Sequence, residues 1–331
     1  MSTYFITGGF GFLGQYIVQA IHDFDPQGEL RVLVRSQRKT FLNLEKLNRV
    51  KWVRGELTQP ESFAEHLKGV DTVIHSAAVI SFTQANVRKV FDSNVIGTRN
   101  LAHAAREAGC KNFIFISSIS AIEFRPPQIT DETMIPDLET KRKHDIYGYT
   151  KLMSEMELKK MVDDMRVIIL NPSVILGPGV EFAGAIVNAI HKLPLLPMID
   201  YVNAFVDVRD VARAVTLALT KGRSGERYIV SSHNISMADF TRIIVKQLGK
   251  TTRVFALSPF GLWLADEFVL LLDTLHLNSS IRRPSQMKID KPCSYEKIKR
   301  EMGWEPTYSL DQSITDSRSK SDWQSDLPIR L

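Results

Sequence analysis

The sequence lacks several features that mark particular classes of protein. Its 331 residues include two cysteines, Cys110 and Cys293, which cannot build a disulfide framework or a four-cysteine zinc site. We interpret them as reduced thiols of a cytoplasmic protein and expect no bound metal. Low complexity is excluded as well, because 44% hydrophobic and 24% charged residues are typical of an ordinary globular chain.

Long apolar runs and targeting segments are also missing. Residues 1–6 run directly into a glycine-rich turn, so we expect no signal peptide. The most apolar stretch, 260–277, is interrupted by three acidic residues, and we expect no membrane-spanning helix. The formal net charge is +5, from 42 Lys and Arg against 37 Asp and Glu. This small excess suits a protein that binds phosphorylated small molecules and does not argue for a nucleic-acid partner.

In the first half of the chain, short apolar runs alternate with segments of helical periodicity. The predicted strands are 4–6, 30–34, 52–54, 72–75, 113–116 and 166–170. The predicted helices are 12–22, 61–67, 94–108 and 147–161. This alternation predicts an α/β fold with a doubly wound, parallel Rossmann sheet.

The regular alternation weakens after Asn171. We interpret 205–208 and 227–230 as strands that return to the first domain. The first domain is therefore expected to comprise residues 1–172 plus about 205–232, and a smaller second domain about 173–204 plus 233–331. Helices are expected at 237–248 and 295–302, and the basic run 141–144 is expected in a solvated loop.

A glycine-rich turn follows the first predicted strand and opens the first predicted helix. Its glycines allow a tight turn, close approach of backbone to a pyrophosphate and close helix–strand packing. Free N–H groups at the start of the helix then face the phosphates. The alternative is a glycine-rich turn without a ligand. The residues that we expect at the cofactor are Thr7, Gly8, Gly11, Phe12, Leu13 and Gly14.

The second predicted strand ends at Arg35, where NAD-binding domains carry an acidic residue for the ribose 2′-hydroxyl. An arginine at this position can pair with a 2′-phosphate and stack on adenine. Arg38 and Lys39 follow closely. The pattern favours NADP(H), with NAD(H) as the alternative cofactor, and a solvated basic loop is the reading without a ligand.

Tyr147 and Lys151 lie four residues apart on a predicted helix and so project from one face. An ammonium group near a phenol lowers the pKa of the phenol, which makes a proton donor or acceptor near neutral pH. Tyr149 has no such partner, because residue 153 is methionine. Ser117 and Ser118 follow a predicted strand, where a hydroxyl can bind a substrate carbonyl; local capping is the alternative.

The chain resembles the extended short-chain dehydrogenases/reductases, also called the epimerase/dehydratase family. The similar segments run in the family's order along nearly the whole chain: 7–14, 75–78, 94–98, 117–118, 147–151, 171–172 with 177–178, 205–210 and 303–306. The resemblance implies that Tyr147 is the catalytic acid/base, that Lys151 holds the nicotinamide ribose and tunes Tyr147, and that Ser118 orients the carbonyl.

The resemblance implies further contacts. Asn94 would support a proton relay through water, and the helices that carry Asn94 and Tyr147 would form a homodimer. The remaining cofactor contacts that it implies are Ala77 and Ala78 along the cofactor, Pro172 and Ser173 beside the nicotinamide, and Glu56 and Leu57 near the adenine. The family has Asp where Glu56 stands, which weakens that assignment.

The segment 171–178 bears on the substrate. Members that act on nucleotide sugars have an asparagine for the substrate diphosphate where this chain has Val174, which cannot donate a hydrogen bond. The segment is more similar to dihydroflavonol reductases and 3β-hydroxysteroid dehydrogenases. Large apolar side chains in 255–264 and 268–272 can line a hydrophobic pocket. They can instead pack the core of the small domain, or contact a second subunit or a membrane surface.

The leading hypothesis is an NAD(P)H-dependent oxidoreductase. It would transfer hydride between nicotinamide and the carbonyl or alcohol of an apolar small molecule such as a ketone, an aldehyde, a sterol-like compound or an acyl compound. An NAD-dependent nucleotide-sugar epimerase or dehydratase is the alternative. A cofactor-sensing protein without turnover is a third reading, which the intact Ser118, Tyr147 and Lys151 disfavour.

Overall fold

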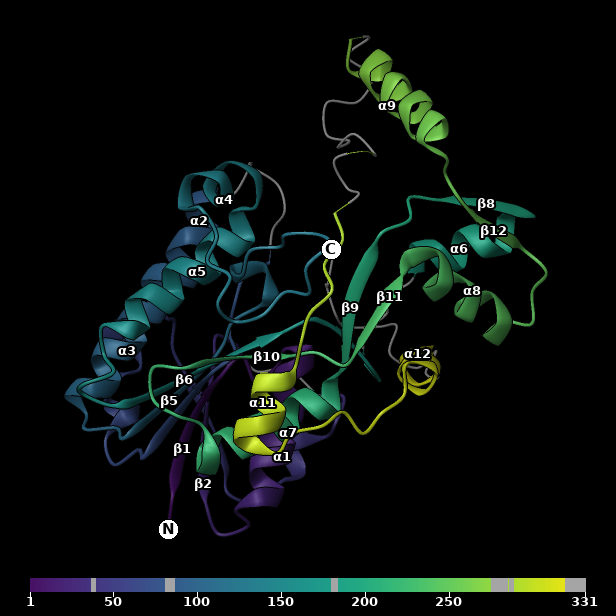
Figure 1. Ribbon diagram of the computed structural model, residues 1–331. Coiled ribbons are helices and arrows are strands. Elements are labelled where there is room, and N and C mark those ends of the chain that lie inside the picture. The colour runs from purple at the N-terminus through teal and green to yellow at the C-terminus, as the bar shows by residue number, and fades with distance from the viewer. Residues whose placement is uncertain (37–39, 81–86, 180–183, 275–284, 286–288, 319–331) are drawn as a thin grey trace.

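A seven-stranded parallel sheet forms the centre of the molecule (Figure 1). The computed structural model describes residues 1–36, 40–80, 87–179, 184–274, 285 and 289–318. The strands of this sheet are β1 (Thr3–Thr7), β2 (Glu29–Val34), β3 (Val50–Arg54), β4 (Thr72–His75), β5 (Asn112–Ile116), β6 (Arg166–Pro172) and β10 (Arg227–Val230). Their order is β10-β6-β5-β4-β1-β2-β3, and β1 pairs with both β2 and β4. The predicted doubly wound parallel sheet is confirmed.

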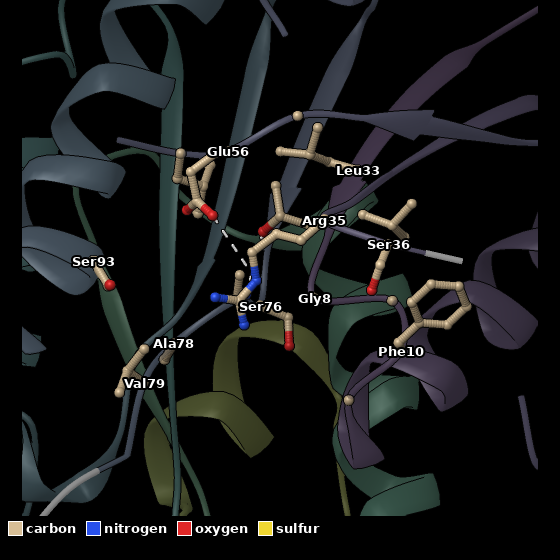
Figure 2. A pocket seen from close by; sticks show the side chains of 17 residues that line it. Gly8, Phe10, Leu33, Arg35, Ser36, Glu56, Ser76, Ala78, Val79 and Ser93 are labelled. Atoms are coloured by element: carbon tan, nitrogen blue, oxygen red, sulfur yellow. Dashed lines mark hydrogen bonds and ion pairs between the residues drawn. The ribbon is translucent and has the colours of Figure 1, made fainter. Parts of the chain in front are cut away.

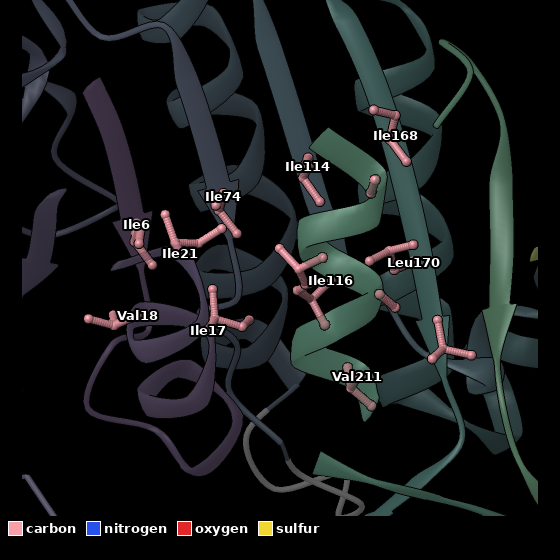
Figure 3. Close-up of a cluster of buried hydrophobic side chains, with 14 of the residues drawn as sticks. Ile6, Ile17, Val18, Ile21, Ile74, Ile114, Ile116, Ile168, Leu170 and Val211 are labelled. Carbon is pink, nitrogen blue, oxygen red and sulfur yellow. The ribbon is translucent and has the colours of Figure 1, made fainter. Parts of the chain in front are cut away.

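Alternating side chains of the strands fill two separate cores. In β5, Ile114 and Ile116 join the core beneath α1 (Phe12–Phe24) and α7 (Val208–Lys221), which Figure 3 shows. The intervening Phe113 and Phe115 join the core beneath α3 (Gly97–Glu107) and α5 (Ile146–Lys159). Such strands are apolar on both faces, which explains why they could be recognised as continuous apolar runs.

A smaller unit packs around its own core. Its strands are β7 (Val174–Leu176), β9 (Val202–Asp207) and β11 (His233–Ser236) in one sheet and β8 (Leu195–Met198) with β12 (Arg253–Ala256) in another. Its helices are α6 (Gly184–Lys192), α8 (Met237–Gln247) and α12 (Leu310–Arg318). The rings of Phe205 and Phe240 stack at 4.6 Å between centroids within this core. The domain boundaries themselves stay a prediction.

One predicted strand lies in a different sheet from the one expected. Residues 205–208 were expected to return to the first domain together with 227–230. The second of these forms β10 and pairs with β6 in the large sheet. The first belongs largely to β9, which among the described residues pairs with β7 and β11 and with no strand of the large sheet. Apolar content alone cannot tell which sheet a strand joins.

Three predicted local structures need correction. The expected helix 61–67 consists of two 3₁₀ turns, Pro60–Ser62 and Ala64–Leu67, because a proline begins the segment and the run is short. The expected loop 141–144 is helical: α4 (Leu138–His144) begins where the Asp137 carboxylate accepts the Thr140 N–H. The expected helix 94–108 begins earlier, at α2 (Val87–Phe91), and passes through a π-helical turn at Asp92–Ile96 before α3.

The expected helices 237–248 and 295–302 correspond to α8 and α11 (Glu296–Met302). A further helix, α9 (Pro259–Thr274), extends away from the rest of the molecule in Figure 1. Among the described residues, no helix combines the length and the apolarity that crossing a membrane requires.

Strand β9 passes directly into helix α7 at Asp207. This buried carboxylate accepts the Arg209 N–H at the start of α7 (2.9 Å) and the Ser313 hydroxyl from α12 (2.7 Å). It also pairs with the Arg209 guanidinium, at 2.8 Å to Nε. One side chain therefore connects the small sheet, a helix of the large sheet and the last described helix.

The chain after α11 is held against α7 by Asp210 and Trp304. The Asp210 carboxylate accepts hydrogen bonds from the Thr307 N–H, the Thr307 hydroxyl and the Tyr308 N–H. The Trp304 indole is fully buried and donates to the Asp210 carbonyl (2.9 Å). These contacts account for the segments 205–210 and 303–306, which were recognised as motifs far apart in the sequence.

Replacement of Trp304 by alanine is expected to lower the free energy of unfolding by about 3–5 kcal/mol, because it leaves a cavity in the core beneath α7. Urea denaturation followed by circular dichroism measures this loss. Trp263→Ala is the matched control, since Trp263 is 53% exposed and its loss should cost less than about 0.5 kcal/mol. Equal losses in the two variants would contradict this account of the core.

Candidate active site

The glycine-rich turn connects β1 to α1 at the carboxyl edge of the sheet. Gly8 has φ +78°, and a Cβ there would lie 2.7 Å from the Ala77 nitrogen. A Cβ on Gly14 would fall on the Gly8 carbonyl. Both positions therefore require glycine. Within the described chain, no side chain caps the first turn of α1 and that turn carries no acidic residue, so its N–H groups remain available to an anion.

A cavity of about 320 Å³ lies beside this turn (Figure 2). Eight of the predicted cofactor residues line it: Thr7, Gly8, Gly11, Arg35, Glu56, Leu57, Ala77 and Ala78. Ser76, Val79 and Ser93 also line it and were not predicted as site residues. A cavity between a glycine turn, an uncapped helix start and an arginine fits the diphosphate and adenosine ends of a dinucleotide.

The other predicted cofactor residues lie outside the lining of this cavity. Phe12 packs edge-on against Tyr16 at 5.9 Å, and Leu13 packs against the core beneath α1. Pro172 ends β6, and the Ser173 N–H donates to the Val230 carbonyl (3.0 Å). The roles of these residues at a cofactor stay predictions.

Arg35 follows β2 and projects over the cavity in Figure 2. Its side chain is 72% exposed, and its Nε lies 3.9 Å from the Glu56 carboxylate, a weak and solvated ion pair. The guanidinium can therefore exchange Glu56 for another anion at little cost. Arg38 and Lys39, which strengthened the sequence interpretation, lie outside the described residues.

A buried histidine, His75, joins three segments of the site. The Thr98 hydroxyl donates to the Asn94 carbonyl (2.5 Å), so it accepts from His75 Nε2 at 2.8 Å. His75 Nδ1 then accepts the Thr7 hydroxyl at 2.6 Å. Thr7 Oγ1 in turn accepts the Ala77 N–H (3.2 Å). Burial lowers the pKa of His75 to about 3, and the ring is neutral.

Asn94 continues this chain of hydrogen bonds from the π-helical turn. Its amide oxygen accepts the Val79 N–H (2.8 Å), and its Nδ2 donates to the Val79 carbonyl (2.9 Å). Nδ2 also lies 3.1 Å from the Thr150 hydroxyl of α5. These contacts hold the wall of the cavity after β4 against the helix that carries Tyr147. The predicted water relay through Asn94 stays a prediction.

Ser118, Tyr147 and Lys151 come together where β5 ends against α5. The Ser118 side chain hydrogen-bonds to Tyr147. Lys151 Nζ lies 6.0 Å from the centre of the Tyr147 ring. Ser118 also accepts the Ser120 N–H (3.1 Å), so the capping alternative holds as well. Ser117 instead donates to a buried carboxylate at 2.5 Å, which agrees with the choice of Ser118.

The pKa of Tyr147 differs from the sequence prediction in direction. Burial raises it to about 12, although the hydrogen bond from Ser118 opposes this shift. Lys151 does not lower it in this arrangement, because Lys151 Nζ donates to the Ile116 carbonyl (2.7 Å) and burial lowers the pKa of Lys151 to about 7. The predicted lowering is therefore wrong for the protein without ligands, and Tyr147 is a protonated phenol at neutral pH.

Three large side chains of the apolar segment 255–264, Phe255, Phe260 and Trp263, do not pack the core of the small unit. Phe260 and Trp263 of α9 are 67% and 53% exposed, and their rings stack at 5.7 Å. Phe255 of β12 is exposed too. None of these residues lines the described cavity. The core alternative is thus wrong for them, and the pocket alternative is untested.

Comparison with known proteins agrees with this geometry. The family model for the NAD dependent epimerase/dehydratase family matches residues 4–231. The chain belongs to this family. A Synechocystis sp. protein that bears the name dihydroflavonol 4-reductase is 31% identical over 243 residues, 71% of this chain and 69% of that protein. Sterol demethylase protein B of Methylococcus capsulatus is 28% identical over 328 residues, 92% of this chain and 94% of that protein.

A solved structure has the same fold. The dTDP-glucose 4,6-dehydratase of Bacillus anthracis, in complex with NAD, superposes with a TM-score of 0.74 at 20% identity over 98% of each chain. These matches confirm the predicted family and the Rossmann fold. They also confirm that the protein is an oxidoreductase that acts on CH–OH groups.

Acidification is expected to destabilise the protein through His75. The unfolded histidine binds a proton near pH 6.5 and the folded one only near pH 3, so stability is lost as the pH falls through this window. Between pH 7 and pH 5, protonation of His75 in the unfolded chain should lower the free energy of unfolding by about 2 kcal/mol. Urea unfolding at both pH values measures the loss, and His75→Gln should show a smaller one. The exposed His191→Gln control should behave as the wild type; the same pH dependence in all three proteins would refute the role of His75.

Proposed function

We propose that this protein is an NADPH-dependent reductase of an apolar carbonyl compound. The observation that carries the proposal is the contact between Ser118 and a partly buried, protonated Tyr147, with Lys151 beside them. Reduction of a carbonyl requires a proton donor, and a phenol with a pKa of about 12 holds its proton at neutral pH.

Ser118, Tyr147 and Lys151 each have a separate role in this reaction. A nicotinamide cofactor, when bound, supplies the hydride. Ser118 hydrogen-bonds the carbonyl oxygen of the substrate and stabilises the charge that develops there. Tyr147 donates its proton to the same oxygen. Lys151, whose Nζ lies 6.0 Å from the centre of the Tyr147 ring, would hold the ribose of the nicotinamide.

Two features support NADPH over NADH and an apolar substrate over a nucleotide sugar. Arg35 is exposed beside the cavity and only weakly paired, which leaves it available to a 2′-phosphate. Val174, at the position of the diphosphate-binding asparagine, packs against the core of the small unit. The relative named sterol demethylase protein B spans almost the whole chain and supports a sterol-like ligand.

The nucleotide-sugar epimerase or dehydratase remains the second candidate, because the dTDP-glucose 4,6-dehydratase shares the fold over the whole chain. Tightly bound NAD in the purified protein, with conversion of a UDP-sugar, would favour it.

We further propose that the protein is a cytoplasmic homodimer formed through α3 and α5. Light scattering on the purified protein tests whether it is a dimer.

Tyr147→Phe is expected to reduce turnover by about 10²–10⁴-fold, because it removes the proton donor. The assay follows NADPH and NADH oxidation against hydrophobic ketones and aldehydes, a 3-ketosteroid, a β-keto ester and UDP-sugars. NADPH affinity should stay unchanged. Tyr149→Phe is the matched control and should retain activity. Full activity of Tyr147→Phe would overturn the assignment.

Arg35→Ala is expected to weaken NADPH binding by roughly tenfold to a hundredfold, the effect of one charge-assisted hydrogen bond, and to leave NADH binding unchanged. Fluorescence titration of both cofactors measures the difference. Arg54→Ala, an exposed arginine at the end of β3 outside the cavity, serves as the control. An equal loss of affinity for both cofactors would show that Arg35 does not read the 2′-phosphate.

A further inference from the structure

Three consecutive residues at the end of β5 each bond to a different turn of α5. The Ile116 carbonyl accepts Lys151 Nζ (2.7 Å), the Ser117 hydroxyl donates to Glu155 Oε1 (2.5 Å), and the Ser118 side chain bonds to Tyr147. Positions 147, 151 and 155 share one face of the helix. The relative position of Ser118 and Tyr147 is therefore set by all three bonds, of which the proposed chemistry uses only two.

Glu155 is bonded more extensively than its contact with Ser117 alone. Its Oε1 also accepts Asn171 Nδ2 (2.7 Å), and the same Nδ2 donates to the Ser118 carbonyl (2.9 Å). Arg227 Nη1 lies 3.4 Å from Oε2. Glu155 thus joins β5, β6 and β10 to α5.

This ion pair lies in the interior of the protein. The side chains of Glu155 and Arg227 are 1% and 8% exposed. Arg227 is held by the carbonyls of Glu132 (2.8 Å) and Met134 (3.2 Å). Burial of two charges is costly, and apolar residues of similar size often serve structure equally well. We therefore expect the buried charge of Glu155 to have a role beyond packing.

We propose that Glu155 is a positioning residue: its buried carboxylate fixes Ser118 against Tyr147 through hydrogen bonds and places a negative charge one helical turn from Lys151. The proposal rests on the proposed function, because it assigns a purpose to the geometry of those three residues. Replacement of the carboxylate by a neutral amide would keep the shape of the side chain and remove its charge.

The charges around Lys151 are consistent with this role. Glu155 and Tyr147 face it from α5, and His75, neutral at physiological pH, faces it from β4. Burial lowers the pKa of Lys151 to about 7, and the charge of Glu155 opposes that shift. Burial raises the pKa of Glu155, and the hydrogen bond from Ser117, the charge of Arg227 on β10 and the charge of Lys159 on α5 oppose this shift.

The test reads Lys151 directly and needs neither substrate nor cofactor. Full-length protein labelled with ¹³C at the lysine Cε is titrated by NMR between pH 5 and pH 11, and the Lys151 signal is assigned by its loss in Lys151→Arg. Glu155→Gln is expected to lower the midpoint of Lys151 by about one pH unit. Ser117→Ala, which removes a donor to the carboxylate and keeps its charge, should leave the midpoint in place.

An unchanged midpoint in Glu155→Gln would overturn the proposal. If this variant does not fold, Glu155→Asp decides instead: it withdraws the carboxylate by one methylene and must shift the midpoint in the same direction by a smaller amount. A shift of the midpoint in a protein that reduces no carbonyl would refute the proposed function and leave the role of Glu155 intact.

Discussion

Both faces of the seven-stranded sheet are covered by helices, and this constraint decides where a ligand can bind. A buried parallel sheet offers free polar groups only where its strands end. Residues of the site lie at the carboxyl ends of these strands: Thr7 at the end of β1, Arg35 after β2, Glu56 after β3, Ala77 after β4, Ser118 after β5 and Pro172 at the end of β6. The cavity and the Ser118–Tyr147 contact both lie along this edge.

Much of this arrangement could be predicted from the sequence, because it depends on local patterns. Strands that are apolar on both faces stand out as continuous runs, and a glycine turn between strand and helix indicates its own ligand. The strands of the small unit are short and half-exposed, so β8, β11 and β12 gave no such pattern. The sheet that β9 joins could not be predicted for a related reason, since pairing partners are chosen in three dimensions.

The bonds and protonation states of the site residues were harder to predict than which residues form the site. Spacing places Tyr147 and Lys151 on one face of a helix, but it does not specify where the lysine points. Lys151 Nζ is bonded to the Ile116 carbonyl, and burial of the phenol raises the pKa of Tyr147 instead. Glu155 escaped notice because a glutamate on a helix usually faces solvent, and its partner Arg227 lies 72 residues away in the sequence.

The junction at Asp207 bears on how the protein can open and close. Strand β9 of the small sheet and helix α7 of the large sheet are one unbroken stretch of backbone, and their joint is fixed by Arg209 and by Ser313 of α12. A hinge needs residues that can change their φ and ψ angles. At the β9–α7 junction, the contacts of Asp207 restrain such a change. A rotation of one unit against the other at this point would have to break the contacts of Asp207 with Arg209 and Ser313.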